Sequence, residues 1–248
     1  MIINNNIAAL NTHRQMGQVS GNAASSMEKL SSGMRINKGA DDAAGLSISE
    51  KMRGQIRGLE QASKNSQDAV SMIQTADGAL NESHAILQRM RELTVQAAND
   101  TNNTAERDAI GGELEQLTET LTDISTNTQF NGIQLLTGDA GPTTNGKLTI
   151  QSGANSGETL ELDLGKANLT GILTALDTGM TAGVDTAANA ATALTAIDAA
   201  IQSVSDGRGY IGAVQNRLDY TINNLNASAE NTQAAESRVR DVDYAEAA

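Results

Sequence analysis

Few residues of this sequence have the types and spacing that chemistry requires. His13 and His84 are the only histidines and there is no cysteine, so the clustered nitrogen and sulfur ligands of a metal site are missing. Glu113, Glu115 and Glu119 follow the spacing of a solvated helix face, without the apolar surroundings that prepare a carboxyl group for acid–base work. We therefore expect no catalytic residue, no metal and no cofactor.

Two short stretches with glycine, Ser31-Ser32-Gly33 and Gly207-Arg208-Gly209, could suggest phosphate loops. Each lacks a preceding strand and the Gly-Lys-Ser/Thr ending of such a loop. We interpret them as joints in the chain rather than as binding sites.

The charge balance excludes further classes. Seventeen basic and thirty acidic residues give a formal net charge of −13, whereas a nucleic-acid partner requires a basic face. No run approaches the ~18 apolar residues of a membrane span, and the first residues do not have the pattern of a Sec signal peptide. We expect no nucleic-acid binding and no membrane insertion, and any self-assembly must bury apolar stripes.

Long helices are the elements that position any functional surface. Apolar or small residues recur in alternating steps of three and four, which is typical of a heptad seam. The seam comprises Leu59, Ala62, Ser66, Ala69, Ile73, Ala76, Leu80, Ser83, Leu87, Met90, Thr94 and Ala97. A second stripe beside it, Met72, Ala79, Ile86 and Leu93, predicts that this helix contacts more than one partner.

Two more helices follow the same logic. After a polar loop over 99–104, in which Thr104 is expected to cap the next helix, a seam steps through Ile110, Leu114, Leu117, Leu121 and Ile124. A short loop predicts that this helix lies antiparallel to the first. A third long helix is predicted from Leu194 to Val239, with Gly207, Gly209 and Gly212 as a weak point or bend.

The middle of the chain, from Thr126 to about Ala188, is rich in Gly, Thr and Asn. Alternation over 148–151 and 160–164 predicts short strands, with turns at 137–139 and 155–157. The fold class we expect is mainly α, an elongated antiparallel helical bundle or coiled coil with a small β-hairpin region. The first forty residues hold too little apolar surface to order alone and would need a partner helix.

Separated motifs in this order resemble those of bacterial flagellins. They are INNNIAALNT over 3–12, MEKLSSGMRIN over 27–37, ADDAAGL over 40–46, LQRMREL over 87–93, TQFNG over 128–132 and AESRVRDVD over 235–243. The resemblance covers both ends of the chain and most of its helical part.

The resemblance implies a domain organisation. Residues 1–42 would form the N-terminal part of an inner core domain, and residues 43–136 the N-terminal half of a helical domain. Residues 137–188 would be a β-hairpin and variable region, and residues 189–248 the C-terminal half of the helical domain. Flagellins continue some tens of residues beyond the motif ending at Asp243, so the C-terminal segment of the inner core is expected to be absent and these 248 residues to stay monomeric in solution.

The resemblance also implies a function: a structural subunit, not an enzyme, that self-assembles into the extracellular flagellar filament for swimming. Its expected partners are other flagellin subunits, the flagellar export apparatus, cap and junction proteins, and host Toll-like receptor 5. Export would use the flagellar type III route rather than Sec. Two alternatives remain: an adhesion or immune-ligand module, and a hook–filament junction protein.

Two groups of site residues are carried over from the family by motif. The receptor-binding group is Gln88, Arg89, Arg91, Glu92, Leu93 and Glu113, with Arg89 as the polar anchor and Leu93 as the apolar anchor. The group for inter-subunit and core assembly is Ile3, Ile7, Leu10, Leu30 and Ile36.

Overall fold

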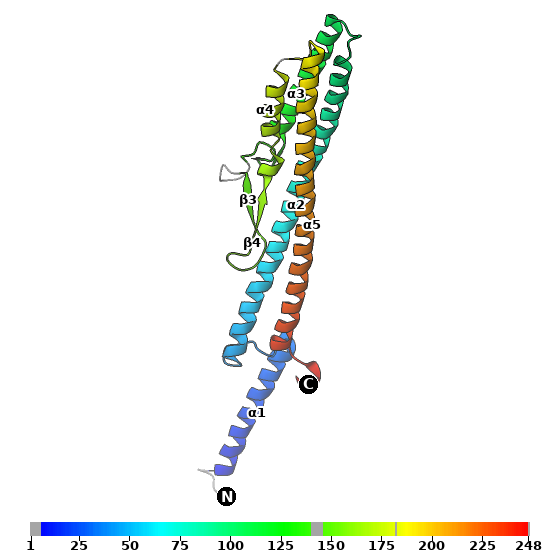
Figure 1. Ribbon diagram of the computed structural model, residues 1–248. Helices are drawn as coiled ribbons and strands as arrows, with labels where there is room; N and C mark the ends of the chain where they lie inside the picture. The colour runs from blue at the N-terminus through cyan, green and yellow to red at the C-terminus, as the bar shows by residue number, and fades with distance from the viewer. Residues whose placement is uncertain (1–5, 140–145, 182, 248) are drawn as a thin grey trace. The chain divides into compact units, whose positions relative to one another are not determined.

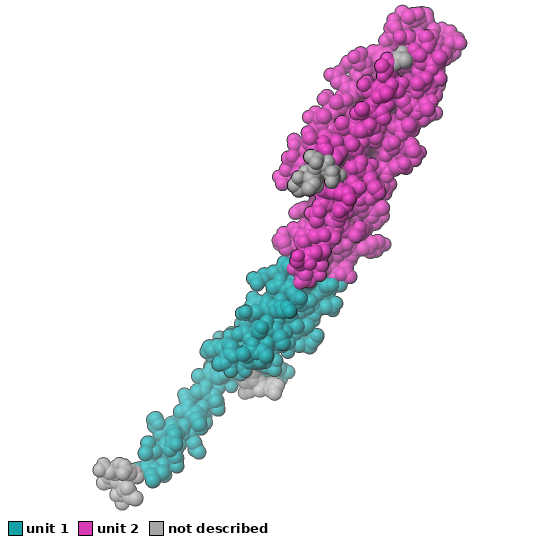
Figure 2. Space-filling model, turned by 60° about the vertical axis from the view of Figure 1, so that its left-hand side comes forward, with its two compact units in different colours: residues 1–60, 226–248 teal, residues 61–225 magenta. Residues whose placement is uncertain are grey.

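The computed structural model describes residues 6–139, 146–181 and 183–247. The chain divides into two compact units, one of residues 1–60 with 226–248 (unit 1) and one of residues 61–225 (unit 2), shown in teal and magenta in Figure 2. Two helices contribute to both units, α2 (Ala43–Ala97) and α5 (Ala187–Arg240). We describe each unit by itself.

Unit 2 is built on three helical segments that lie side by side: its part of α2, α3 (Thr104–Asn127) and its part of α5 (Figure 1). The seam predicted for α2 is confirmed, because every one of its members from Ala62 to Ala97 is buried. Ion pairs tie α2 to α5: Arg91 Nε lies 2.6 Å from Asp198 Oδ1, and Arg208 Nε lies 3.0 Å from Asp77 Oδ1. The mainly α fold class with a small β-hairpin region is therefore confirmed.

The start of α3 differs from the prediction. Its N-cap is Asn103, not Thr104: the Asn103 side chain accepts from the backbone N–H of Glu106, and the Glu106 carboxylate accepts from the backbone N–H of Asn103. This capping box satisfies two backbone donors at once, whereas Thr104 at the cap position would leave residue 107, an arginine, as the reciprocal partner.

Arg107 joins the ends of two helices. Its side chain is only 13% exposed and donates to the backbone carbonyls of Ala97, Asn99 and Asp185. Carbonyls at the end of a helix have no intrahelical partner and attract positive charge. Arg107 therefore satisfies the end of α2 and holds it to the segment that leads into α5.

Two antiparallel hairpins lie in unit 2. Strands β1 (Gln129–Phe130) and β2 (Ile133–Gln134) are joined by Asn131-Gly132, whose positive φ angles of 51° and 80° are those of a tight type I′ turn. Strands β3 (Lys147–Gln151) and β4 (Thr159–Asp163) match the predicted alternation. The second hairpin is held to α5 by the Tyr210 hydroxyl, which accepts the backbone N–H of Asp163 at 3.1 Å.

A helix was missed within the stretch predicted as hairpins and turns. After a 3-10 turn, η1 (Leu164–Ala167), the chain forms α4 (Leu169–Met180), which packs on α3. Asn168 caps α4 by accepting from the backbone N–H of Gly171, and Leu169, Leu173 and Leu176 are buried. Their spacing is helical, but the threonines and glycines between them hid the pattern.

Helix α5 is continuous through all three glycines expected to weaken it. Gly207 is buried, and a β-carbon there would lie 3.0 Å from the carbonyl oxygen of Lys166 in η1. Gly207 thus allows η1 to approach the helix backbone closely. Gly209 and Gly212 have no such neighbour within 4 Å.

Unit 1 contains α1 (Ile7–Ser32), which is capped by the Asn6 side chain and ends at Gly33 with a φ of 70°. Beyond α1 the chain pairs with the end of α5: Arg35 N–H donates to the carbonyl of Arg240, and Val242 N–H donates to that of Gly33. No described residue of α1 is buried. The helix therefore forms without covering its apolar side chains.

Candidate functional site

The residues predicted to bind a receptor are divided by the structure into four environments, three at the surface and one in the core. Arg89, Glu92 and Glu113 lie together on the surface formed by α2 and α3 (the α2–α3 surface). Arg91 instead faces α5, through its ion pair with Asp198. Gln88 lies on α2 within 2.9 Å of the His84 imidazole, Nε2 to Nε2.

Arg89 is the centre of the α2–α3 surface. Its Nε and Nη2 donate to one carboxylate oxygen of Glu113 at 3.1 and 2.8 Å, and Nη1 lies 3.5 Å from Glu92 Oε2. The hydrogen bond that Arg89 donates to Glu113 raises the pKa of Arg89 above its ordinary value, with a smaller contribution from Glu92. The Arg89 side chain is still 52% exposed, and an exposed ion pair of this kind contributes only about 0–1 kcal/mol to stability. A partner carboxylate can therefore replace Glu113 at small cost.

Leu93 is in a different position from the other predicted contacts. It is 3% exposed and belongs to the core of unit 2. In this conformation Leu93 packs beneath the surface residues rather than projecting from them. The helical periodicity, which assigned it to the second stripe of α2, indicated the same location.

The predicted assembly residues lie in unit 1. Ile7 and Leu10 of α1 are among the most exposed large apolar side chains, Leu30 is half-buried, and Ile36 is buried. Ile3 lies outside the described residues. Other apolar side chains of α1 are as exposed as Ile7, namely Met16, Val19 and Met27 at 67–68%.

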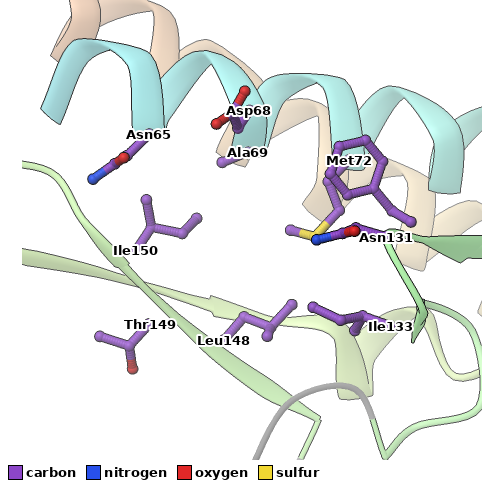
Figure 3. A pocket seen from close by; sticks show the side chains of 10 residues that line it. Asn65, Asp68, Ala69, Met72, Asn131, Ile133, Leu148, Thr149 and Ile150 are labelled. Carbon is purple, nitrogen blue, oxygen red and sulfur yellow. The ribbon is translucent and has the colours of Figure 1, made fainter. Parts of the chain in front are cut away.

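An open groove in unit 2 lies between α2 and the two hairpins and has a volume of about 460 Å³ (Figure 3). Its lining is mostly apolar, with Met72, Ile133, Leu148 and Ile150 pointing into it. Asp68 is the one titratable side chain that lines it. A single carboxylate offers no acid–base pair, so this groove has no catalytic arrangement.

Neither a candidate metal site nor a membrane-spanning helix is found in the described part of the chain. Residues 6–139, 146–181 and 183–247 contain no group of three His, Cys, Asp or Glu side chains that could hold a metal ion. Within the same ranges, none of the helices has both the length and the apolar character needed to cross a bilayer.

Comparison with known proteins agrees with this architecture. The model of the bacterial flagellin N-terminal helical region matches residues 3–140, and that of the C-terminal helical region matches residues 194–248. Flagellin from Halalkalibacterium halodurans is 54% identical over 99% of this chain and 87% of its own length. Flagellin from Bacillus subtilis is 49% identical over 99% of this chain and 88% of its own length.

Solved structures give the same result. The crystal structure of Bacillus cereus flagellin is 35% identical, with a TM-score of 0.54 over 70% of this chain and 94% of that one. A Vibrio parahaemolyticus protein described as a flagellar hook-associated protein has a TM-score of 0.66 over 81% of this chain and 100% of that one, but at 15% identity it shows a shared fold alone.

This chain belongs to the bacterial flagellin family. It is a structural subunit of the extracellular flagellar filament and not an enzyme.

Proposed function

We propose that the flagellin to which these 248 residues belong builds the filament by self-assembly, with the uncovered apolar side chains of α1 as the surface that neighbouring copies bury. The supporting observation is that α1 is a complete helix of 26 residues with no buried side chain. Contiguous exposed apolar surface marks an interaction site, and its burial stabilises an interface by roughly 25 cal/mol per Å². The subunit would reach the growing end by flagellar type III export and would contact cap and junction proteins there.

Replacing Met16 and Val19 of α1 by aspartate should lower filament yield at least tenfold. Both side chains would be buried between subunits, where an unpaired carboxylate is strongly unfavourable. The measurement is electron microscopy of filaments from cells that make the variant as their flagellin.

The matched control is Gln18→Asp with Ser25→Asp, which adds the same charge to exposed polar positions of α1 away from the Met16–Val19 face. Both double variants should retain the circular dichroism spectrum of the parent, because none of the four side chains is buried. Normal filaments from the Met16/Val19 variant would exclude α1 as an assembly surface.

A second role, recognition of the free subunit by host Toll-like receptor 5, is proposed for the α2–α3 surface. Its support is an exposed arginine held in place by Glu113 through an ion pair that a receptor carboxylate can replace. Arg89 would be the polar anchor. Leu93 is buried and would act indirectly, by holding in place the part of α2 that carries Arg89. The same face would pack between subunits in the filament, so the receptor would bind monomer only.

Arg89→Ala should reduce receptor signalling at least tenfold, since loss of one central arginine of an interface commonly costs about 2 kcal/mol or more. The measurement is the dose response of a Toll-like receptor 5 reporter cell line to purified monomer. Arg208→Ala is the matched control, because it breaks another ion pair between two helices of unit 2. An Arg89→Ala dose response equal to that of the parent would reject this role.

The alternative functions are less well supported. Adhesion or immune recognition as the primary role would use the α2–α3 surface but would not explain the exposed apolar side chains of α1. A hook–filament junction role is compatible with the fold shared with the Vibrio protein, yet the relatives with the higher sequence identities are flagellins.

A further inference from the structure

One aromatic side chain of the described residues is left largely in solvent. Of the four aromatic residues, Phe130, Tyr210 and Tyr244 each contact other parts of the protein. Tyr220, on α5 in unit 2, is 77% exposed. A large aromatic ring left in water, in a chain that has so few, indicates a surface made for a partner.

Tyr220 is accompanied by an arginine one helical turn before it. Arg217 and Tyr220 line a shallow hollow of about 480 Å³ together with Asn224 and Ser152, and no carboxylate lines it. Among the described residues, Arg217 forms no ion pair. Tyrosine and arginine are two of the residue types that dominate binding energy at interfaces. We call this surface the Arg217–Tyr220 patch.

A second surface of unit 2 has the complementary character. A groove of about 450 Å³ lies between α3, α4 and the segment after α4, here named the α3–α4 groove. Its apolar lining includes Leu114, Met180 and Val184.

Three carboxylates complete the lining of the α3–α4 groove: Glu115, Glu119 and Asp177. Over the described ranges of the chain, no Lys, Arg or His lies within ion-pair distance of any of them. By contrast, Glu92 and Glu113 of the α2–α3 surface share Arg89 as a counterion. The groove therefore offers negative charge without an internal counterion.

We propose that the Arg217–Tyr220 patch of one subunit docks into the α3–α4 groove of a second copy of the chain. The Tyr220 ring covers the apolar lining of the groove, and the Arg217 guanidinium pairs with the groove carboxylates. The Tyr220 hydroxyl donates a hydrogen bond to one of these carboxylates. Because the two surfaces differ, the contact is heterologous. When two subunits have docked, one still has a free groove and the other a free patch, and each can bind a further subunit. A contact of this kind propagates and also offsets part of the repulsion between chains of net charge −13.

This inference rests on the proposed self-assembly and assigns two of its surfaces. It can be tested by cross-linking, because the sequence contains no cysteine. Asn224→Cys borders the patch and Thr122→Cys borders the groove, and both positions are exposed. Filaments of the double variant, treated with a short bis-maleimide, should give a ladder of covalent oligomers on a denaturing gel.

The matched control joins Asn224→Cys to Gln74→Cys, an exposed position of α2 outside the groove, and should give at least tenfold less oligomer. A second arm tests the charges. Arg217→Glu should lower filament yield at least tenfold, and adding Glu115→Arg with Glu119→Arg should restore it, whereas exposed Lys64→Glu should leave the yield unchanged.

The outcomes separate this inference from the function on which it rests. A ladder with rescue of Arg217→Glu supports the docking. Normal parent filaments together with no ladder from the Asn224→Cys/Thr122→Cys variant, or normal assembly of Arg217→Glu, overturn the docking and leave self-assembly in place. A parent chain that forms no filament in cells overturns self-assembly and the docking with it.

Discussion

Leu80→Ala is expected to destabilise unit 2 by about 3 kcal/mol, which is more than a hundredfold in the folding equilibrium. Leu80 is fully buried at the centre of the α2 seam. Truncation removes apolar contacts and leaves a cavity that three packed helices can close only in part. The measurement is urea denaturation followed by far-UV circular dichroism, with hydrogen exchange to locate the loss in residues 61–225.

Leu10→Ala is the control for Leu80→Ala, because it makes the same truncation on α1, where the side chain is 60% exposed. Its effect on stability should stay below about 0.5 kcal/mol. Equal losses for the two variants would contradict the assignment of the core to the seam of α2 and its partners.

Gly207→Leu is expected to destabilise unit 2 by about 2 kcal/mol, as overpacking of a well-filled site commonly does. A β-carbon at this position already lies 3.0 Å from the Lys166 carbonyl and 3.4 Å from the α-carbon of Ala167. These are backbone atoms, so the clash cannot be relieved by turning a side chain. The same urea titration measures the effect.

Gly209→Leu, by contrast, should not lower the stability of unit 2. This glycine lies two residues further along α5 with nothing within 4 Å of the added β-carbon. Leucine favours a helix interior over glycine by up to about 0.8 kcal/mol, so Gly209→Leu should be neutral or stabilising. If Gly207→Leu changed the stability no more than Gly209→Leu does, η1 would not be packed against the α5 backbone as described.

Much of the fold followed from periodicity. The α2 seam needs apolar residues at steps of three and four, and Ile73, Leu80 and Leu87 satisfy that rule, so the prediction placed the core correctly. The buried face of α5 was predicted less completely. Ala193, Ala200 and Gly207 are buried there, but small residues are common on any helix face and their burial depends on what approaches them.

The residues predicted to bind a receptor show a different limit of sequence reasoning. Arg89 and Glu113 are far apart in the chain, and no spacing rule joins them. Only the antiparallel packing of α2 and α3 brings the two side chains together. Leu93 was assigned both to the buried stripe and to the receptor contact, and the motif alone could not separate those roles. Tyr220 could have been noticed as an outlier of composition, since its neighbours on α5 are mostly polar.

The bare surface of α1 has a consequence for the exchange of subunits. A helix without buried side chains can unwind in the free subunit with little loss of packing, so the conformational entropy of ordering it is incurred when neighbours cover it. If neighbouring subunits cover α1 as proposed, part of the attraction gained on docking would offset the cost of that ordering, and a newly added subunit would be held less tightly than a rigid block of equal contact area. Subunits at the end of a filament would therefore be readily replaceable, while those inside, covered on every side, would be fixed in place.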